Sequence, residues 1–233
     1  METSNLTPLE MKNLVIKEVV IKHLKDAGFK SKGQTFYSLR NDICLTVKVW
    51  GNRFNSQFTG YSFDLRIEAF PADTWKDKIK FMYEYIDERC FLPKCGFLHP
   101  YHSGLGYTVG GYQDGVPIVQ KYDDIRDYIN NDFEQYIIPG LQKIQCQEDY
   151  DKVKKEYLEY FDSPEISLLR FFSGLQSNAN LTHETLKVDF EWIPVKIEDI
   201  KANRDIYEQV REYSGWPSVN KWDQLMLLLT TYF

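Results

Sequence analysis

Residues 43–50, ICLTVKVW, and residues 58–70, FTGYSFDLRIEAF, decide the fold of this chain. Apolar side chains alternate with polar or mixed ones in both stretches, which is the pattern of a strand with one buried face. In the second stretch, Asp64, Arg66 and Glu68 alternate with the apolar set. Residues 35–39, TFYSL, predict a shorter strand just before them. Three successive strands with short connections predict an antiparallel meander.

Helical patterns flank this meander. Residues 8–27 carry an apolar stripe at helical spacing, with Thr7 and Glu10 placed for a capping box and Gly28 placed as a stop. From Asp123 onward the apolar spacing predicts a second long helix, which Pro139 and Gly140 should break or kink. Residues 149–161 predict another helix. We therefore expect an α+β protein, with an antiparallel sheet packed against helices.

Two stretches between these patterns are less regular. Residues 72–88 fit a short helix, which we favour, or an insertion that carries a further strand. Residues 91–119 are rich in Gly and Pro, which indicates loops around short strands near residues 107–109 and 117–120.

The pattern changes again after Ser163 and Pro164. We expect an α+β domain at residues 1–162 and a mostly helical C-terminal extension at residues 163–233, packed on that domain. The expected elements of the extension are helices at 166–175, 197–213 and 219–231, a turn at 178–180, and a strand or extended arm at 187–195.

Composition and charge limit the classes of function and compartment. The net charge of -6 argues against nucleic acid as the main partner, because a phosphate backbone is bound by clustered Lys and Arg. No apolar run is long enough to span a bilayer, so no membrane partner is expected, and the N-terminus lacks the apolar run of a signal peptide. The four cysteines are too sparse for a secreted disulfide scaffold, which indicates a cytoplasmic protein with free thiols. Aromatic residues make up 15% of the chain, and we expect most of them in the core, with an aromatic binding face as the alternative.

Residues 24–30, LKDAGFK, and residues 32–37, KGQTFY, resemble the opening of bacterial domain-of-unknown-function family 4304. The helical segment from Tyr122 through Pro139 to Phe161 is similar to the closing helices of that family. The likeness covers about residues 8–162. It implies a bacterial source and an α+β fold with helices against an antiparallel sheet, and it implies no activity.

Residues 90–102, CFLPKCGFLHPYH, hold the densest group of possible metal ligands. Two of the four cysteines and two of the four histidines fall within this stretch, as Cys90, Cys95, His99 and His102. Thiolate and imidazole are the ligands that zinc prefers, so these four residues could form a tetrahedral site. The Cys–Cys spacing is wider than in the usual zinc knuckle, and a rigid Pro follows His99. The alternative is that the cysteines are small buried side chains and the histidines lie in a polar loop.

Other catalytic patterns fail on their spacing. The glycine-rich residues 103–111, SGLGYTVGG, lack the Lys-Ser/Thr of a phosphate-binding loop. His183 has no second histidine at the zinc-protease spacing, and the adjacent His102 and Ser103 would point apart on a strand. No catalytic residue and no cofactor is predicted, with zinc as the alternative.

Two functions remain open. One is a non-enzymatic protein-binding module with an acidic, aromatic surface, such as an immunity protein that neutralises a basic toxin. The other is a small-molecule or metal-binding protein, or an enzyme, with a pocket near residues 90–112. The pattern leaves the oligomeric state open.

Overall fold

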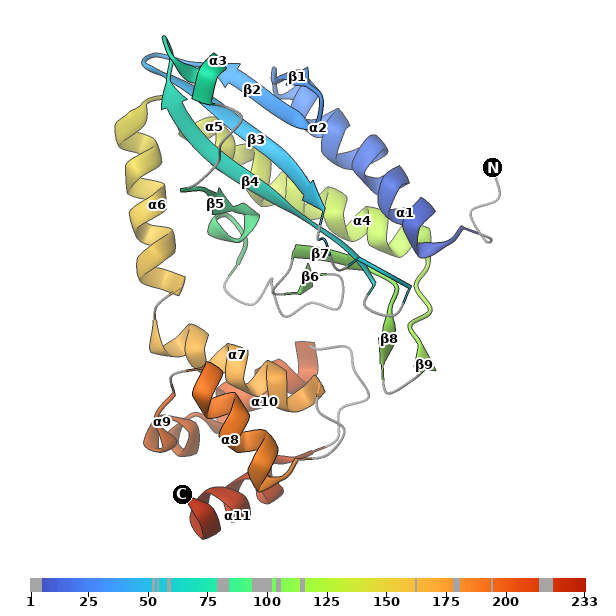
Figure 1. Cartoon of the computed structure of the whole chain (residues 1–233), viewed down its shortest axis with the longest axis vertical. Coiled ribbons are helices and arrows are strands. Elements are labelled where there is room, and N and C mark those ends of the chain that lie inside the picture. Colours follow the sequence, from blue (N-terminus) through green and yellow to red (C-terminus); the bar gives the residue numbers. More distant parts are fainter. Residues whose placement is uncertain are drawn as a thin grey trace. The chain divides into compact units, whose positions relative to one another are not determined.

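The computed structural model describes residues 6–51, 53, 55–57, 60–78, 84–93, 102–103, 106–113, 116–161, 163–177, 181–193, 195–213 and 220–233. The chain divides into two compact units, a sheet unit that runs to Tyr157 and a helical unit at Leu158–Phe233 (Figure 1). The division falls within helix α6 (Gln147–Phe161), a few residues before the boundary expected at 162–163. That the helical part packs on the first domain stays a prediction.

The first helix of the sheet unit forms where its sequence predicts it. It consists of α1 (Pro8–Val15), a π-helical turn η2 (Ile16–Val20) and α2 (Ile21–Asp26). Thr7 and Glu10 form the expected capping box, in which each side chain bonds the backbone of the other residue. The chain leaves the helix at Gly28 with φ 86°, a conformation that favours glycine. The predicted helix at residues 8–27 is confirmed.

An antiparallel sheet forms the centre of this unit. Its described strands are β1 (Lys30–Lys32), β2 (Thr35–Leu39), β3 (Ile43–Gly51), β4 (Tyr61–Pro71), β5 (Ile86–Asp87), β6 (His102–Ser103) and β7 (Gly106–Val109). Their order is β1-β2-β3-β4-β7-β6, and β5 pairs with β4 away from β7. The predicted meander is confirmed as β2-β3-β4, and the α+β class is confirmed with it.

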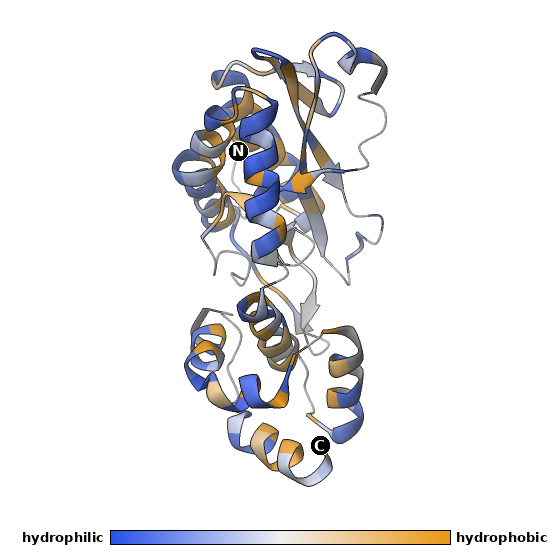
Figure 2. Ribbon diagram, turned by 90° about the vertical axis from the view of Figure 1, so that its left-hand side faces the viewer, coloured by the Kyte–Doolittle hydropathy of each residue, from blue (hydrophilic) through white to orange (hydrophobic). Residues whose placement is uncertain are grey.

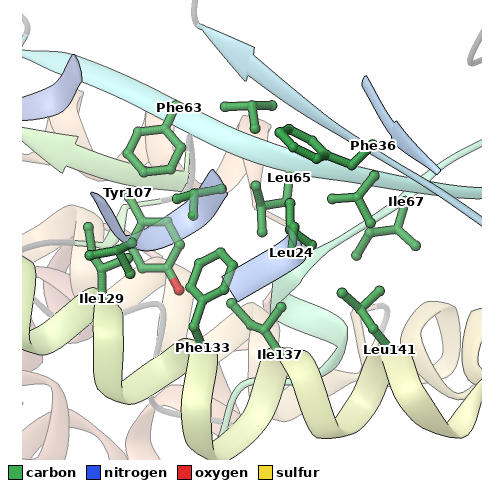
Figure 3. Packing of buried hydrophobic residues seen from close by; sticks show 14 of the residues in the cluster. Leu24, Phe36, Phe63, Leu65, Ile67, Tyr107, Ile129, Phe133, Ile137 and Leu141 are labelled. Carbon is green, nitrogen blue, oxygen red and sulfur yellow. The ribbon is translucent and has the colours of Figure 1, made fainter. Parts of the chain in front are cut away.

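One face of the sheet carries the main hydrophobic core. Figure 3 shows Phe36, Phe63, Leu65 and Ile67 from the strands pointing toward the long helix that runs through α4 and α5, with Leu24 of α2 beside them. Hydrophobic residues lie on the inner sides of these helices and hydrophilic residues on their outer sides (Figure 2). The second face of the sheet is therefore left for other contacts.

The long helix does not break at its proline. It consists of α4 (Tyr122–Asp132), a π-helical turn η5 (Phe133–Ile137) and α5 (Ile138–Lys143). In the π turn, the N–H of Ile138 donates to the carbonyl of Phe133, so that Pro139 falls in the first turn of a new α segment. A first turn tolerates a residue without an N–H donor. Of the expected break or kink at Pro139 and Gly140, the break is wrong for this reason, and the kink stays a prediction.

The favoured helix at residues 72–88 is wrong at its C-terminal end. The helix found there, α3, spans only Trp75–Lys78, and residues 79–83 lie outside the described residues. Ile86 and Asp87 instead form β5 and pair with β4, followed by a 3-10 turn η3 at Glu88–Cys90. Ile86 is buried, so its apolar contacts and its pairing with β4 override the local helical preference. The alternative of a further strand is correct here.

A small hairpin follows the sheet. It consists of β8 (Tyr112–Gln113) and β9 (Val116–Pro117). The strand expected near residues 107–109 is β7, and the strand expected at 117–120 overlaps β9 only at Pro117.

The described part of the helical unit is built from helices. They are α7 (Pro164–Ser177), α8 (His183–Trp192), α9 (Ile197–Ala202), α10 (Arg204–Tyr213) and α11 (Trp222–Tyr232). The helix expected at 166–175 is confirmed, the one at 197–213 is interrupted at Asn203, and the turn at 178–180 lies outside the described residues. None of the described helices is long and apolar enough to cross a membrane.

The strand or arm expected at residues 187–195 is wrong. Residues 187–192 belong to α8, which Thr182 begins with a capping box. Leu186 is fully buried, and the Phe190 ring lies 5.3 Å from that of Phe171. Leu186 and Phe190 are one helical turn apart, so helical spacing places both on one side of α8.

Candidate functional site

The predicted metal ligands fall mostly outside what the structure describes. Cys95 and His99 are not among the described residues, and His102 is described only through its backbone in β6. Cys90 ends η3 and packs against the main core, where burial raises the pKa of its thiol well above the usual range. The described residues hold no group of three or more His, Cys, Asp or Glu able to bind a metal. The metal site therefore stays a prediction.

A buried polar network lies close to Cys90. Glu88 is fully buried, and its Oε2 accepts a 2.7 Å hydrogen bond from the backbone N–H of Leu65. The hydroxyl of Tyr107 donates to Asp132 at 3.0 Å, and burial together with the Asp132 charge holds the pKa of this phenol well above its usual range. One bond joins η3 to β4 and the other joins β7 to α4, so their role is to order the core.

A shallow polar groove runs between η2 and α4, lined in part by Lys22, Arg126 and Asn130. Its walls are tied together by hydrogen bonds. Glu18 accepts from the hydroxyl of Tyr122 at 2.6 Å, and His23 bonds Asn130 at 2.8 Å. Because these polar groups are already hydrogen-bonded to each other, the groove is best explained as the contact region between two packed helices.

The face of the sheet opposite the main core divides into a covered end and a more open end. At the covered end, Cys44 and Phe70 are buried together with Trp75, the first residue of α3. At the open end, the β3–β4 register places Trp50 opposite Asp64 and Lys48 opposite Arg66. Side chains directly opposite each other in an antiparallel pair share a face, so these four residues form one surface.

Arg66 is the centre of that surface. Its guanidinium carbon lies over the rings of both Trp50 and Tyr85, at 4.1 and 4.3 Å from their centroids. The Lys48 ammonium lies 4.6 Å from the centroid of the same Trp50 ring. Two like charges on directly opposite residues repel, and the electron-rich face of a tryptophan offsets that repulsion by attracting both. We call Lys48, Trp50, Asp64, Arg66 and Tyr85 the Arg66 patch.

The polar groups of the Arg66 patch are incompletely paired. Arg66 Nε lies 3.6 Å from Asp64 Oδ2, which is too long for a hydrogen bond. Within the described residues, both Arg66 Nε and Asp64 Oδ1 are buried without a hydrogen-bond partner. Trp50 nevertheless remains 39% exposed, so the surface is open to a binding partner at its edge.

Two carboxylates on β4 have raised pKa values. Burial raises the pKa of Asp64 to about 6, and the nearby Glu88 charge adds to this while Arg66 opposes it. Burial also raises the pKa of Glu68 to about 7, where Lys154 opposes the shift and Glu84 adds to it. Both shifts mean that the folded protein takes up protons here more readily than an unfolded chain does.

Sequence reasoning identified part of this surface and missed its assembly. Strand alternation places Asp64, Arg66 and Glu68 on the outer face of β4, as the structure confirms. The signal that could have identified the site is Trp50, an aromatic residue on the face of β3 that also carries Cys44, Thr46 and Lys48. No local pattern could have brought Tyr85 onto Arg66, because that contact depends on the path of the chain after α3.

Comparisons with protein-family models, with curated proteins and with solved structures found no match to this chain. The resemblance to bacterial domain-of-unknown-function family 4304 therefore stays a prediction. The Arg66 patch has to be interpreted from its own residues.

Proposed function

We propose that this chain is a non-enzymatic protein-binding module and that the Arg66 patch is its binding surface. The observation that carries the proposal is the partly exposed Trp50 ring held against two cationic side chains. Trp, Tyr and Arg are the residues most enriched among those that dominate binding energy at protein interfaces. All three meet in this patch.

The order within the patch supports the same function. Stacking on Trp50 and Tyr85 restricts the Arg66 side chain before any partner arrives. Immobilising a long side chain on binding costs about 0.5–1.5 kcal/mol, so a surface already ordered binds at a smaller entropic cost. The pairing of β3 with β4 also holds the backbone of the patch in place.

An immunity-type inhibitor of a toxin is the partner-binding role that we favour. The net charge of -6 would steer a basic protein toward this chain and raise the rate of encounter. The patch would then supply the short-range contacts. This division between long-range attraction and local recognition is what an inhibitor of a basic toxin requires.

The proposal is tested by comparing three versions of the full chain as bait in a lysate of the cells that make it: wild type, Trp50→Ala and Leu227→Ala. Leu227 is the matched control, because it is 67% exposed and lies on α11 in the helical unit. We expect a protein that binds wild type and Leu227→Ala and is lost by about tenfold or more with Trp50→Ala. The purified protein should show the same ranking. Equal binding to all three baits would refute the proposal.

The second hypothesis, a metal or small-molecule site near residues 90–112, stays a prediction of its own. Metal analysis of the purified chain tests it, with Cys90→Ser as the comparison. Stoichiometric zinc that is lost in this variant would support the site, and zinc-free protein would remove its metal version.

A further inference from the structure

We propose that the Arg66 patch binds a protein segment that supplies an Asp or Glu carboxylate, and that the guanidinium of Arg66 receives it. This inference rests on the proposed function and names the chemistry of the partner at that surface. It concerns the local contact and leaves the overall charge of the partner open.

Part of the hydrogen-bonding capacity of Arg66 is unused. A guanidinium carries five N–H donors in a planar fork that matches a carboxylate. Arg66 Nε is buried without a hydrogen-bond partner among the described residues, and it lies 3.6 Å from Asp64 Oδ2. The guanidinium carbon lies 4.1 and 4.3 Å from the ring centroids of Trp50 and Tyr85, so a carboxylate has to approach the guanidinium where these two rings do not cover it.

The charges on the Trp50 ring favour an acidic group. Lys48 and Arg66 bring two positive charges to the Trp50 ring, and the patch holds one carboxylate, Asp64. Asp87 lies opposite Arg66 on β5, but its carboxylate is already paired with Arg89. A carboxylate is therefore the complementary group at this position, whereas a Lys or Arg would meet two like charges.

An apolar surface lies beside the two cations. Trp50 remains 39% exposed next to the guanidinium. A carboxylate that reaches Arg66 brings its neighbouring side chain onto this ring. The surface thus fits an acidic residue beside an apolar one in the same segment.

The surroundings of Asp64 predict how binding varies with pH. Asp64 faces Arg66 on its own strand and Lys48 on β3, and the Asp87 and Glu88 carboxylates follow on β5 and η3. The pKa of Asp64 is raised to about 6, so acidification below neutral pH removes its charge before it protonates an ordinary partner carboxylate. The patch becomes more positive in that interval, and binding of an acidic segment should tighten.

The test uses blocked peptides of sequence Gly-Asp-Phe-Asp-Gly, with Asn or Lys in place of both Asp residues as matched controls. Each is titrated into the full chain while NMR follows the Arg66 Nε–H and Trp50 indole N–H signals, assigned with Arg66→Lys and Trp50→Phe. We expect the Asp peptide to shift both signals and to bind about tenfold or more tightly than the Asn peptide. Arg66→Lys should remove most of that difference, because it keeps the positive charge and loses the planar fork of N–H donors.

Binding of the Asp peptide should tighten by about two- to threefold between about pH 7.5 and pH 5.5.

Equal binding of the Asp and Asn peptides would overturn the inference, and so would tighter binding of the Lys peptide. Absence of any NMR shift with the Asp peptide would also overturn the inference. If protein capture still depended on Trp50 in that case, the proposed function would survive without the inference. If capture proves independent of Trp50, the proposed function fails whatever the peptides do. Unchanged β3 and β4 amide signals in Arg66→Lys would show that the fold is intact.

Discussion

Arg66 and Glu68 lie two residues apart on the same face of β4, and the two charged groups have different surroundings. The guanidinium of Arg66 lies over the rings of Trp50 and Tyr85. Glu68 has a buried oxygen without a hydrogen-bond partner among the described residues, and its pKa is raised to about 7. On this face of β4, a cation in contact with aromatic rings thus lies beside a carboxylate that is costly to ionise.

Replacing Glu68 with Gln should stabilise the protein at alkaline pH. In the wild type, the folded pKa of Glu68 lies above its ordinary value, so its stability contribution is present at low pH and is lost as pH rises from about 4.5 to about 7. Gln has no charge to desolvate. Urea unfolding should show Glu68→Gln more stable than wild type by about 2 kcal/mol near pH 8, and by less near pH 5. A difference that does not vary with pH would contradict the assigned cause.

Glu88 should be far more sensitive to truncation than a surface glutamate. Its Oε2 satisfies the backbone N–H of Leu65 inside the core. Glu88→Ala leaves that donor buried and unpaired, at a cost of about 2–3 kcal/mol in the free energy of unfolding. Glu88→Gln keeps an acceptor oxygen and should lose less. Chemical denaturation compares both with Glu156→Ala, an exposed position on α6 where we expect a change within about 0.5 kcal/mol.

At the scale of elements, close contact between β4 and β7 depends on a glycine. A Cβ at Gly106 would lie 2.3 Å from the carbonyl oxygen of Phe63 on β4, and Gly106 has φ 89°. Gly33 also has a positive φ, 64°, but a Cβ there would meet nothing within 4 Å. Comparing Gly106 with Gly33 therefore distinguishes the cost of backbone strain from the cost of steric overlap.

We predict that Gly106→Ala lowers the free energy of unfolding by more than about 3 kcal/mol, because strain and a backbone clash add. Gly33→Ala should lose only about 1–2 kcal/mol, which is the cost of a left-handed conformation. Thermal and urea unfolding of both variants measure the difference. Equal losses would mean that β4 and β7 can separate at little cost, contrary to the close packing described above.

The elements that could be predicted are those with a long local period. Residues 8–27 and the strands β2, β3 and β4 each carry enough alternating or helical spacing to fix their type. Two-residue β5 has no period, and it forms because Ile86 and Asp87 pair with β4. Pro139 was misinterpreted because a π turn before it shifts the hydrogen bonding, and α8 because the contact of Phe190 with Phe171 is not visible in a sequence.

The candidate site shows the same limit. The sequence places Lys48, Trp50 and Arg66 on strand faces, and the hairpin register then makes Lys48 and Arg66 neighbours. The contact with Tyr85 arises only in the fold. The predicted ligand group Cys90, Cys95, His99 and His102 rests on residue type alone, and only Cys90 has a described side chain.

At the scale of the whole molecule, the aromatic content serves two purposes. In the helical unit, Phe172, Tyr207 and Trp222 form mutual ring contacts and are buried, as the expectation of an aromatic core requires. In the sheet unit, Trp50 is placed on the outer face and stays partly exposed. A partly exposed aromatic ring outside the core can contribute to binding a partner with little cost to the stability of the fold.

The central claim is that a partner protein covers the Arg66 patch. Hydroxyl-radical footprinting of the full chain, alone and with the captured partner, tests it by measuring oxidation at Trp50 and at Leu227 in the same sample. The account predicts that the partner reduces oxidation of Trp50 by about tenfold while oxidation of Leu227 stays unchanged. Oxidation of Trp50 that is the same with and without the partner would contradict it.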